Sequence, residues 1–347
     1  IMVLWGALTV LLMFVQNATM LYVLRFLLGA AEAGFFPGVI FYLSLWFPNQ
    51  QRGRVTSLFI LAVPLAGIVG GPLSGWIMDS FHDLHGLRGW QWLFLFEGVP
   101  AIVLGLLALV CVADKPQQAR WLSDAEKAIV SAEIEKDHHQ RGAVTSPRLL
   151  DALRSPRLYL LSAIYFANFM GLNALGFWIP TILKGVGVQT LTHIGWLSAV
   201  IWLCTAVGIV VIGRSSDRHM ERRWHAALPG LAAAAAFLLL PVVSHNTTLT
   251  VVLLAVASIG MFGVLIIFWT LPANYLHGTA AAGGIAVISS LGAIAGFVSP
   301  TLVGVLKEQT GSIYTGLAVV AVIVIVGMIA LLLGIPAARK PIATVAW

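Results

Sequence analysis

An arginine and a glutamate stand seven positions apart within a long apolar stretch of this 347-residue sequence. They are Arg25 and Glu32, inside residues 20–47. Seven residues make about two turns of an α-helix, so both side chains project from one face, roughly 10 Å apart along the axis. If this helix crosses a bilayer, each charge costs about 2.5–3.5 kcal/mol on insertion scales, and it is tolerated where it faces a cavity or a partner.

The two side chains suit anion binding and proton transfer. The guanidinium of Arg25 is planar, keeps its proton and matches a carboxylate with two parallel hydrogen bonds. Glu32 carries a carboxyl group, and in a desolvated site such a group can take up and release a proton. The pair therefore predicts anion binding coupled to proton movement. The alternative is a structural ion pair with another helix.

The composition predicts a membrane around these residues. Hydrophobic residues make up 59% of the chain, charged residues only 10%, and the mean hydropathy is +0.93. A soluble protein with this composition would expose large apolar patches, which a lipid-facing surface avoids. A crossing needs on the order of 20 helical residues. Ten runs approach that length, and they lie at residues 1–16, 20–47, 55–78, 91–113, 157–183, 193–213, 224–244, 248–273, 279–304 and 313–336.

The basic residues are divided unequally between the two faces of this layout. Of the 20 lysines and arginines, 16 fall in or beside alternate loops and the C-terminus. The opposite face holds Arg88, Lys184 and Lys307. Because cytoplasmic loops collect positive charge, the pattern places the C-terminus in the cytoplasm. It also accounts for the net charge of +6 without any nucleic-acid partner.

The predicted domains are a four-helix bundle at residues 1–113, a cytoplasmic linker at 114–156 and a six-helix bundle at 157–347. Within the linker, Ser123 and Glu126 have the spacing of a capping box that starts a helix. The two halves also repeat a row of small residues every four positions, at Gly67, Gly71 and Gly75 and at Gly292, Gly296, Pro300 and Gly304. Such rows let helices approach closely in lipid.

A chain of four and six helices with an internal repeat becomes six and six if two further N-terminal helices are restored. The first run is short and begins without an initiator methionine, which favours that interpretation. The expected fold is an all-α helical bundle with ten of twelve transmembrane helices present. Parallel six-helix repeats with a substrate cavity between the halves are a known transporter plan.

Four stretches resemble the anion:cation symporter family of the major facilitator superfamily. They are residues 25–37 (RFLLGAAEAGFFP), 46–52 (WFPNQQR), 119–127 (ARWLSDAEK) and 278–286 (GTAAAGGIA). The likeness runs along essentially the whole chain. It implies a twelve-helix fold, alternating access and uptake of organic anions such as sugar acids, aromatic acids or tartrate. In the family, an arginine and a glutamate at the positions of Arg25 and Glu32 bind substrate and couple protons.

A second motif of the superfamily is a cytoplasmic loop that latches the inner side of the transporter. Residues 213–223, reading GRSSDRHMERR, resemble its copy in the second half. The resemblance implies gating roles for Gly213, Asp217, Arg218 and Arg222. The alternative is a solvated basic loop of the kind the charge rule predicts.

Other polar groups in apolar runs are further candidates for the substrate site. For Asn173, a role in a substrate cavity and a structural role are equally expected. Asn168 is expected to form a hydrogen bond with a neighbouring helix. Trp269 could stack on an aromatic or sugar acid, or simply lie at the membrane interface. Family members carry an asparagine before the serine of the ninth run, where this chain has Ser289 and Ser290. A shorter hydroxyl at Ser289 implies a different substrate profile.

The sequence thus predicts a non-enzymatic secondary transporter, a proton-coupled symporter of a small organic carboxylate. No cofactor or metal is expected, because the histidines and the cysteines Cys111 and Cys204 lack ligand spacing. The expected partners are the anion, protons and lipid, with the protein a monomer in a bacterial inner membrane. Sodium coupling, anion exchange, or a non-transporting sensor on the same fold are the alternatives.

Overall fold

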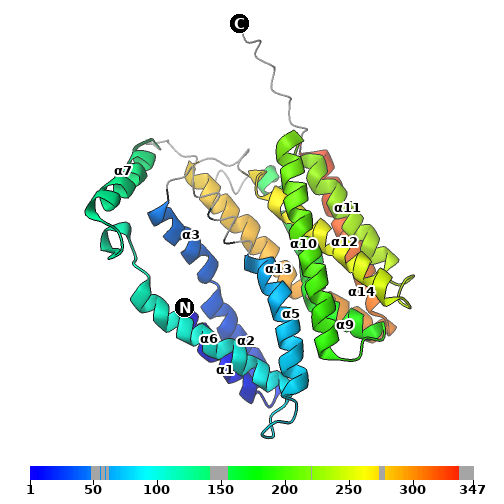
Figure 1. The fold of residues 1–347 in the computed structure, drawn as a ribbon. Coiled ribbons are helices and arrows are strands. Elements are labelled where there is room, and N and C mark those ends of the chain that lie inside the picture. Colours follow the sequence, from blue (N-terminus) through cyan, green and yellow to red (C-terminus); the bar gives the residue numbers. More distant parts are fainter. Residues whose placement is uncertain are drawn as a thin grey trace. The chain divides into compact units, whose positions relative to one another are not determined.

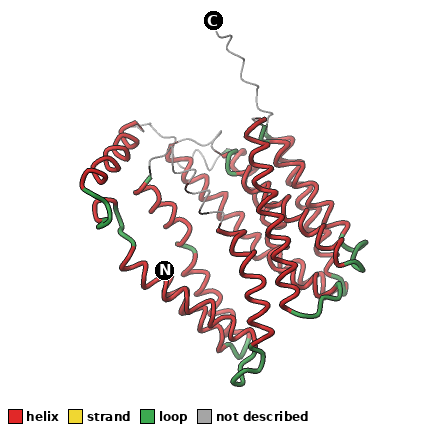
Figure 2. Tube along the Cα trace, viewed as in Figure 1, coloured by secondary structure: helices red, strands yellow, loops and turns green. Residues whose placement is uncertain are grey.

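The computed structural model describes residues 1–47, 55, 59, 62–140, 155–219, 221–272 and 278–335, and within these the regular structure is helical (Figure 1, Figure 2). Contacts divide the chain into two compact units. The first comprises Ile1–Val63 and Leu73–Val144, and the second comprises Pro64–Pro72 and Thr145–Trp347. The α5 helix, Ala62–Ser80, contributes to both.

The first unit is built on two helices that approach closely. The α1 helix (Met2–Leu11) continues as a 3-10 turn (Leu12–Phe14) and packs along α6 (Gly89–Cys111). Gly6 and Gly98 face each other, and a Cβ on either would lie 2.8 Å from the carbonyl oxygen of the other. Two helices meet this closely only where both carry the smallest residue.

Against this pair lie α2 (Ala18–Glu32) and α3 (Phe35–Trp46), whose Phe35 ring meets Trp5 of α1. Outside the apolar spans, α7 (Asp124–Gln140) follows a short turn at Pro116–Gln118 and contacts that turn and α3. The capping box predicted for α7 is confirmed. Glu126 Oε2 accepts hydrogen bonds from the Ser123 amide at 2.9 Å and from its hydroxyl at 2.8 Å. These bonds hold the pKa of the Glu126 carboxyl below its usual value.

From residue 155 onward, the described part of the second unit is a bundle of six helices around a large apolar core. They are α9 (Pro156–Gly185), α10 (Leu191–His219), α11 (Arg223–Leu239), α12 (Thr247–Phe268), α13 (Gly278–Thr310) and α14 (Ile313–Gly334). Small residues bring these helices together as well. A Cβ at Gly260 would collide with the backbone of Pro229, and one at Gly327 would lie 2.5 Å from Ala167 Cβ.

The predicted count of ten transmembrane helices is not confirmed. Six of the described helices, namely α6, α9, α10, α12, α13 from Gly283 and α14, are long and apolar enough to cross a bilayer. Two predicted runs differ from the structure because of proline. The α11 helix ends at Leu239, two residues before Pro241, which has no N–H to donate to the Phe237 carbonyl. Beyond it the chain tightens, and the amides of Val242 and Val243 bond the carbonyls of Leu239 and Leu240. The run at 20–47 is divided into α2 and α3 after Glu32.

Candidate functional site

Arg25 and Glu32 both lie on α2 with exposed side chains. At 100° per residue their directions differ by only about 20°, so they share one stripe of the helix. Gly29 lies between them on that stripe, and a Cβ added there would meet nothing within 4 Å. No residue in the described part of the chain forms a hydrogen bond or an ion pair with Arg25 or Glu32. Within the described part of the chain, one stripe of α2 therefore carries a cation and an acid without a partner for either.

The rest of α2 fixes the direction of this stripe. Leu24 is buried against Leu8 and Leu12, and Leu28 packs on the same cluster. Asn17 caps the helix, its side-chain oxygen accepting a hydrogen bond from the Met20 amide at 2.8 Å. Because Arg25 follows the buried Leu24 by one residue, the helix turns it away from the packed face.

The helical run is interrupted directly after Glu32. Residue 37 is a proline and has no N–H to donate to the Ala33 carbonyl one turn earlier. The amide of Ala33 still bonds the Gly29 carbonyl at 3.0 Å, and the amide of Gly38 bonds the Gly34 carbonyl at 3.0 Å. The series of backbone hydrogen bonds is therefore interrupted only between these two amides. Glu32 thus ends one helix beside a local interruption, across which Ala33 and Gly34 both keep right-handed helical dihedrals.

In the second unit, α9 packs along α13 through a seam of aromatic and small residues. The Tyr165 ring lies against Gly292, where any Cβ would collide with it. Around Tyr165 are Phe169, Phe268 and Trp269, with ring centroids 4.5, 4.9 and 5.0 Å away. Trp269 caps α12 and meets Tyr165 edge to face. The predicted stacking residue therefore belongs to an aromatic cluster and is half-buried.

Asn173 lies two turns beyond Tyr165 on the same side of α9. Its Nδ2 donates to the Phe169 carbonyl at 2.8 Å, and its Oδ1 would lie 3.6 Å from a Cβ at Gly296. Ser289 is half-buried on α13, three and seven residues before Gly292 and Gly296, and so shares their face. The structure thus places Asn173, Ser289 and Trp269 along one α9–α13 seam.

The predicted gating residues lie where α10 passes into α11. Asp217 Oδ1 forms an ion pair with Arg222 Nη1 at 2.6 Å, and the same nitrogen donates to Ser216 Oγ at 3.0 Å. Arg218 is exposed and forms no ion pair with the described residues. Gly213 lies within α10, where a Cβ would make ordinary contact with Ile266. Only Asp217 and Arg222 of the four are brought together.

Comparison of the sequence with known proteins shows the family of the chain. Residues 1–300 match the profile described as Major Facilitator Superfamily. The chain is 44% identical over 92% of its length to "Putative metabolite transport protein NicT" of Pseudomonas putida, covering 73% of that protein. It is 39% identical over 99% of its length to a "Putative tartrate transporter" of Agrobacterium vitis, covering 76% of it.

The chain belongs to the Major Facilitator Superfamily.

The superfamily fold is also recognised in three dimensions. The chain resembles the inward-facing, occupied crystal structure of a bacterial homolog to the human lysosomal transporter Spinster, with a TM-score of 0.70. The match covers 96% of this chain and 80% of that one, and at 16% identity it shows the fold alone. The protein is therefore an all-helical, multi-pass membrane transporter of the superfamily.

Sequence reasoning missed Tyr165, which joins Trp269 to the α9–α13 seam of this superfamily member. The available signal was a helical stripe, because Tyr165, Phe169 and Asn173 recur every four residues. Its partners Trp269 and Gly292 lie more than 100 residues away, so the stripe alone did not distinguish a site from a packed face.

Two other polar residues of the apolar helices, Glu97 and Asn168, differ in their hydrogen bonding. Glu97 is an exposed residue of α6 and accepts a hydrogen bond from Ser74 Oγ at 3.3 Å. Asn168 is completely buried, yet neither end of its amide has a hydrogen-bond partner among the described residues. The partner expected for Asn168 on a neighbouring helix is therefore not found there.

Proposed function

We propose that this transporter is a proton-coupled symporter of a small organic carboxylate that works by alternating access. The observation that carries the proposal is the α2 stripe. Arg25 and Glu32 are exposed on one helix face, unpaired by any described residue, with open space at Gly29 between them. This disfavours the structural ion pair with another helix as an explanation of the two charges.

In the proposed cycle, Arg25 receives the carboxylate through a two-point contact and Glu32 receives the proton. The break after Glu32 supports this role, since the Ala33 carbonyl freed by Pro37 is an acceptor near the acid. The names of two relatives support a carboxylate substrate, because tartrate is a dicarboxylate. Alternating access requires that anion and proton bias the same switch between states, which only differential affinity can do.

Residues of the second unit have subsidiary roles in this proposal. The Asn173 amide and the Ser289 hydroxyl supply hydrogen bonds, and Trp269 supplies an apolar wall together with Tyr165. The Asp217–Arg222 pair acts as the cytoplasmic latch, with Gly213 and Arg218 as the remaining motif positions. We place the protein as a monomer in a bacterial inner membrane, with its C-terminus in the cytoplasm.

The test is tartrate transport by the purified protein in proteoliposomes, with and without an imposed proton gradient. Glu32→Gln mimics the protonated carboxyl. It should abolish accumulation driven by the gradient and preserve counterflow exchange of labelled tartrate. Glu97→Gln is the matched control, because it changes the acid bonded to Ser74 and should leave proton-driven accumulation intact.

Three results would count against the proposal. Accumulation by Glu32→Gln with unchanged pH dependence would remove this acid from the coupling step. Accumulation that follows a sodium gradient instead would make the protein a sodium symporter. Absence of tartrate uptake and of exchange with a panel of other carboxylates would favour the sensor alternative.

A further inference from the structure

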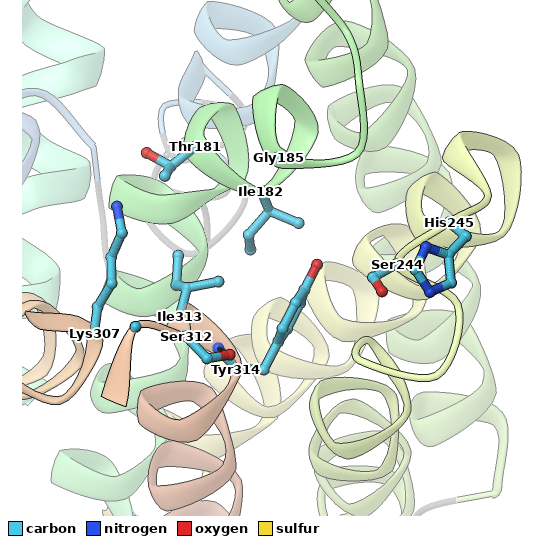
Figure 3. Close-up of a pocket in the computed structure, with 10 residues that line it drawn as sticks. Thr181, Ile182, Gly185, Ser244, His245, Lys307, Ser312, Ile313 and Tyr314 are labelled. Atoms are coloured by element: carbon cyan, nitrogen blue, oxygen red, sulfur yellow. Dashed lines mark hydrogen bonds between the residues drawn. The ribbon is translucent and has the colours of Figure 1, made fainter. Parts of the chain in front are cut away.

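A cavity of about 350 Å³ opens at one end of the second unit (Figure 3). It lies where α9 ends, α11 passes into α12, and α13 passes into α14. Its volume falls at the lower end of the range for small-molecule sites, roughly 300–1,000 Å³. The arginines between α10 and α11 lie at the other ends of these helices, so the positive-inside rule assigns the cavity to the outer face.

The lining is polar and basic. Hydroxyl groups come from Thr181, Ser244, Ser312 and Tyr314, and no aspartate or glutamate is among the described residues that line it. Figure 3 shows Lys307 on one side of the cavity and His245 on the other, with Tyr314 between them. A cavity with hydroxyl donors, a cation and no acid suits an anionic ligand.

Lys307 keeps its charge available for such a ligand. Its Nζ lies 5.5 Å from the centre of the Trp178 ring, a cation–π contact that positions the ammonium without a counter-ion. No described carboxylate forms an ion pair with it. The Trp178 ring also lies 3.8 Å from the position of a Cβ at Gly304, one turn before Lys307, which leaves room for the indole beside the lysine stem.

A tight turn brings a helix start into the same cavity. Gly311 has φ +72°, which favours glycine, and its amide bonds the Lys307 carbonyl at 2.9 Å. The chain then enters α14 at once, with Ser312 as its N-cap. The first turn of this 22-residue helix adds the positive end of its dipole to the charge of Lys307.

We propose that this cavity is a capture site that holds a carboxylate anion on the outer face before transport. The inference deepens the proposed function, since the captured anion is the transported one. Lys307 supplies the charge, while His245 and the hydroxyl groups of Thr181, Ser312 and Tyr314 supply hydrogen bonds. The Ser244 hydroxyl already donates to the Pro241 carbonyl at 2.9 Å. A positive site at the entrance raises the local concentration of the anion and therefore the rate of capture.

The first test compares Lys307→Gln with Lys184→Gln in tartrate uptake. Both lysines are exposed on the same face, but Lys184 does not line the cavity. Lys307→Gln should lower Vmax/KM about three- to tenfold with little change in Vmax, and the difference should shrink at about 0.5 M salt. Lys184→Gln should behave as wild type. Equal effects of the two substitutions, or none, would overturn the capture site.

The second test measures binding directly and does not depend on transport. In Arg25→Ala, which removes the proposed central contact, calorimetry should still detect saturable tartrate binding. That binding should disappear in Arg25→Ala/Lys307→Gln. Its persistence in the double variant, or its absence from the single variant, would refute the proposal.

A lipid headgroup offers similar anionic chemistry and is distinguished by vesicle composition. Tartrate binding should depend on Lys307 in phosphatidylcholine vesicles with and without phosphatidylglycerol. If Lys307→Gln changes only the retention of phosphatidylglycerol, the cavity is a headgroup site and the proposal fails. Wild-type protein that transports no organic anion would instead contradict the proposed function, while the calorimetric comparison would still decide whether the cavity binds a carboxylate.

Discussion

Between Arg25 and Glu32 on the surface of α2 lies Gly29, a residue without a side chain. Gly29 leaves the surface of α2 open between them, and nothing lies within 4 Å of the position that a Cβ would take. A small anion bound to Arg25 could therefore approach Glu32 along the helix surface. In the proposed cycle, this gap is as important as the two charges.

Filling the gap should block binding without unfolding the helix. Gly29→Leu adds a branched side chain between Arg25 and Glu32, and leucine favours the helix by about 1 kcal/mol relative to glycine. We expect tartrate uptake to fall at least tenfold, while the thermal stability of the purified protein stays equal or rises. Gly29→Ala, which adds one methyl group, should retain most uptake. Normal uptake by Gly29→Leu would place the bound anion elsewhere.

At the level of single residues, the sequence predicted only part of the candidate site. Arg25 and Glu32 stand out because charges in apolar runs are expensive and therefore rare. Tyr165 did not stand out, since its significance depends on Trp269 and Gly292, which come from distant segments. Likewise, the basic loop gave no reason to choose Arg222 over Arg218 as the partner of Asp217. That choice depends on how the chain turns between α10 and α11.

The turn between α10 and α11 is organised by a carboxylate at the start of a helix. Glu221 accepts hydrogen bonds from the Trp224 amide at 2.7 Å, the His225 amide at 3.0 Å and the His225 ring at 2.8 Å. Burial alone would raise the pKa of Glu221, but these bonds outweigh it and hold the pKa below its ordinary value. The folded protein therefore favours the ionised form.

This linkage predicts a pH-dependent contribution to stability. Because the folded pKa is lowered, the contribution is present above the unfolded pKa of about 4.3 and is lost as pH falls through the folded value. Glu221→Gln should cost about 1 kcal/mol at pH 7, in the range of a lost helix cap. The difference in melting temperature from wild type should shrink below about pH 4. A constant difference across this range would contradict the role of the charge.

The α1 and α6 helices pack closely through two glycines. The Gly6–Gly98 contact admits no side chain, whereas Gly176 on α9 has nothing within 4 Å of a Cβ. Gly98→Leu should therefore separate α1 from α6 and destabilise the protein by about 1–3 kcal/mol, as overpacking does. Gly176→Leu is the matched control and should be nearly neutral. Thermal unfolding in detergent measures both, and equal melting temperatures would mean that α1 and α6 tolerate separation.

Helix positions were more predictable than helix interruptions. The apolar runs of the second unit match the described helices to within a few residues, apart from longer ends on α10 and α13 and earlier ends on α11 and α12. The break between α2 and α3 was not predicted, although Pro37 marks it. A proline tells where a hydrogen bond is missing, but not whether the helix bends or stops there.

At the scale of the whole molecule, the repeat of the two halves stays a prediction. The glycine rows of residues 67–75 and 292–304 suggest equivalent helices, and these correspond to α5 and α13. The contacts of α5 are divided between the two units, whereas α13 belongs entirely to the second. Membership of the superfamily explains the fold, but the chemistry proposed for it depends on α2 in one unit and on the α9–α13 seam in the other.

The Asp217–Arg222 pair should influence the distribution of conformational states more than the stability of the fold. The Asp217 side chain is 70% exposed, and an exposed ion pair is worth about 0–1 kcal/mol. If the latch forms in only one state of the transport cycle, Asp217→Asn can shift the equilibrium between states by at most about fivefold. We therefore expect tartrate uptake to fall by up to about fivefold, with a melting temperature close to wild type.

Asp217→Arg should lower uptake further, since it places two cations together, and adding Arg222→Asp should recover much of the loss. Uptake assays in proteoliposomes, normalised to protein amount, would measure all three variants. If the charge exchange restores nothing, the pair is a feature of a solvated basic loop, and the latch must depend on Arg218 or on other residues.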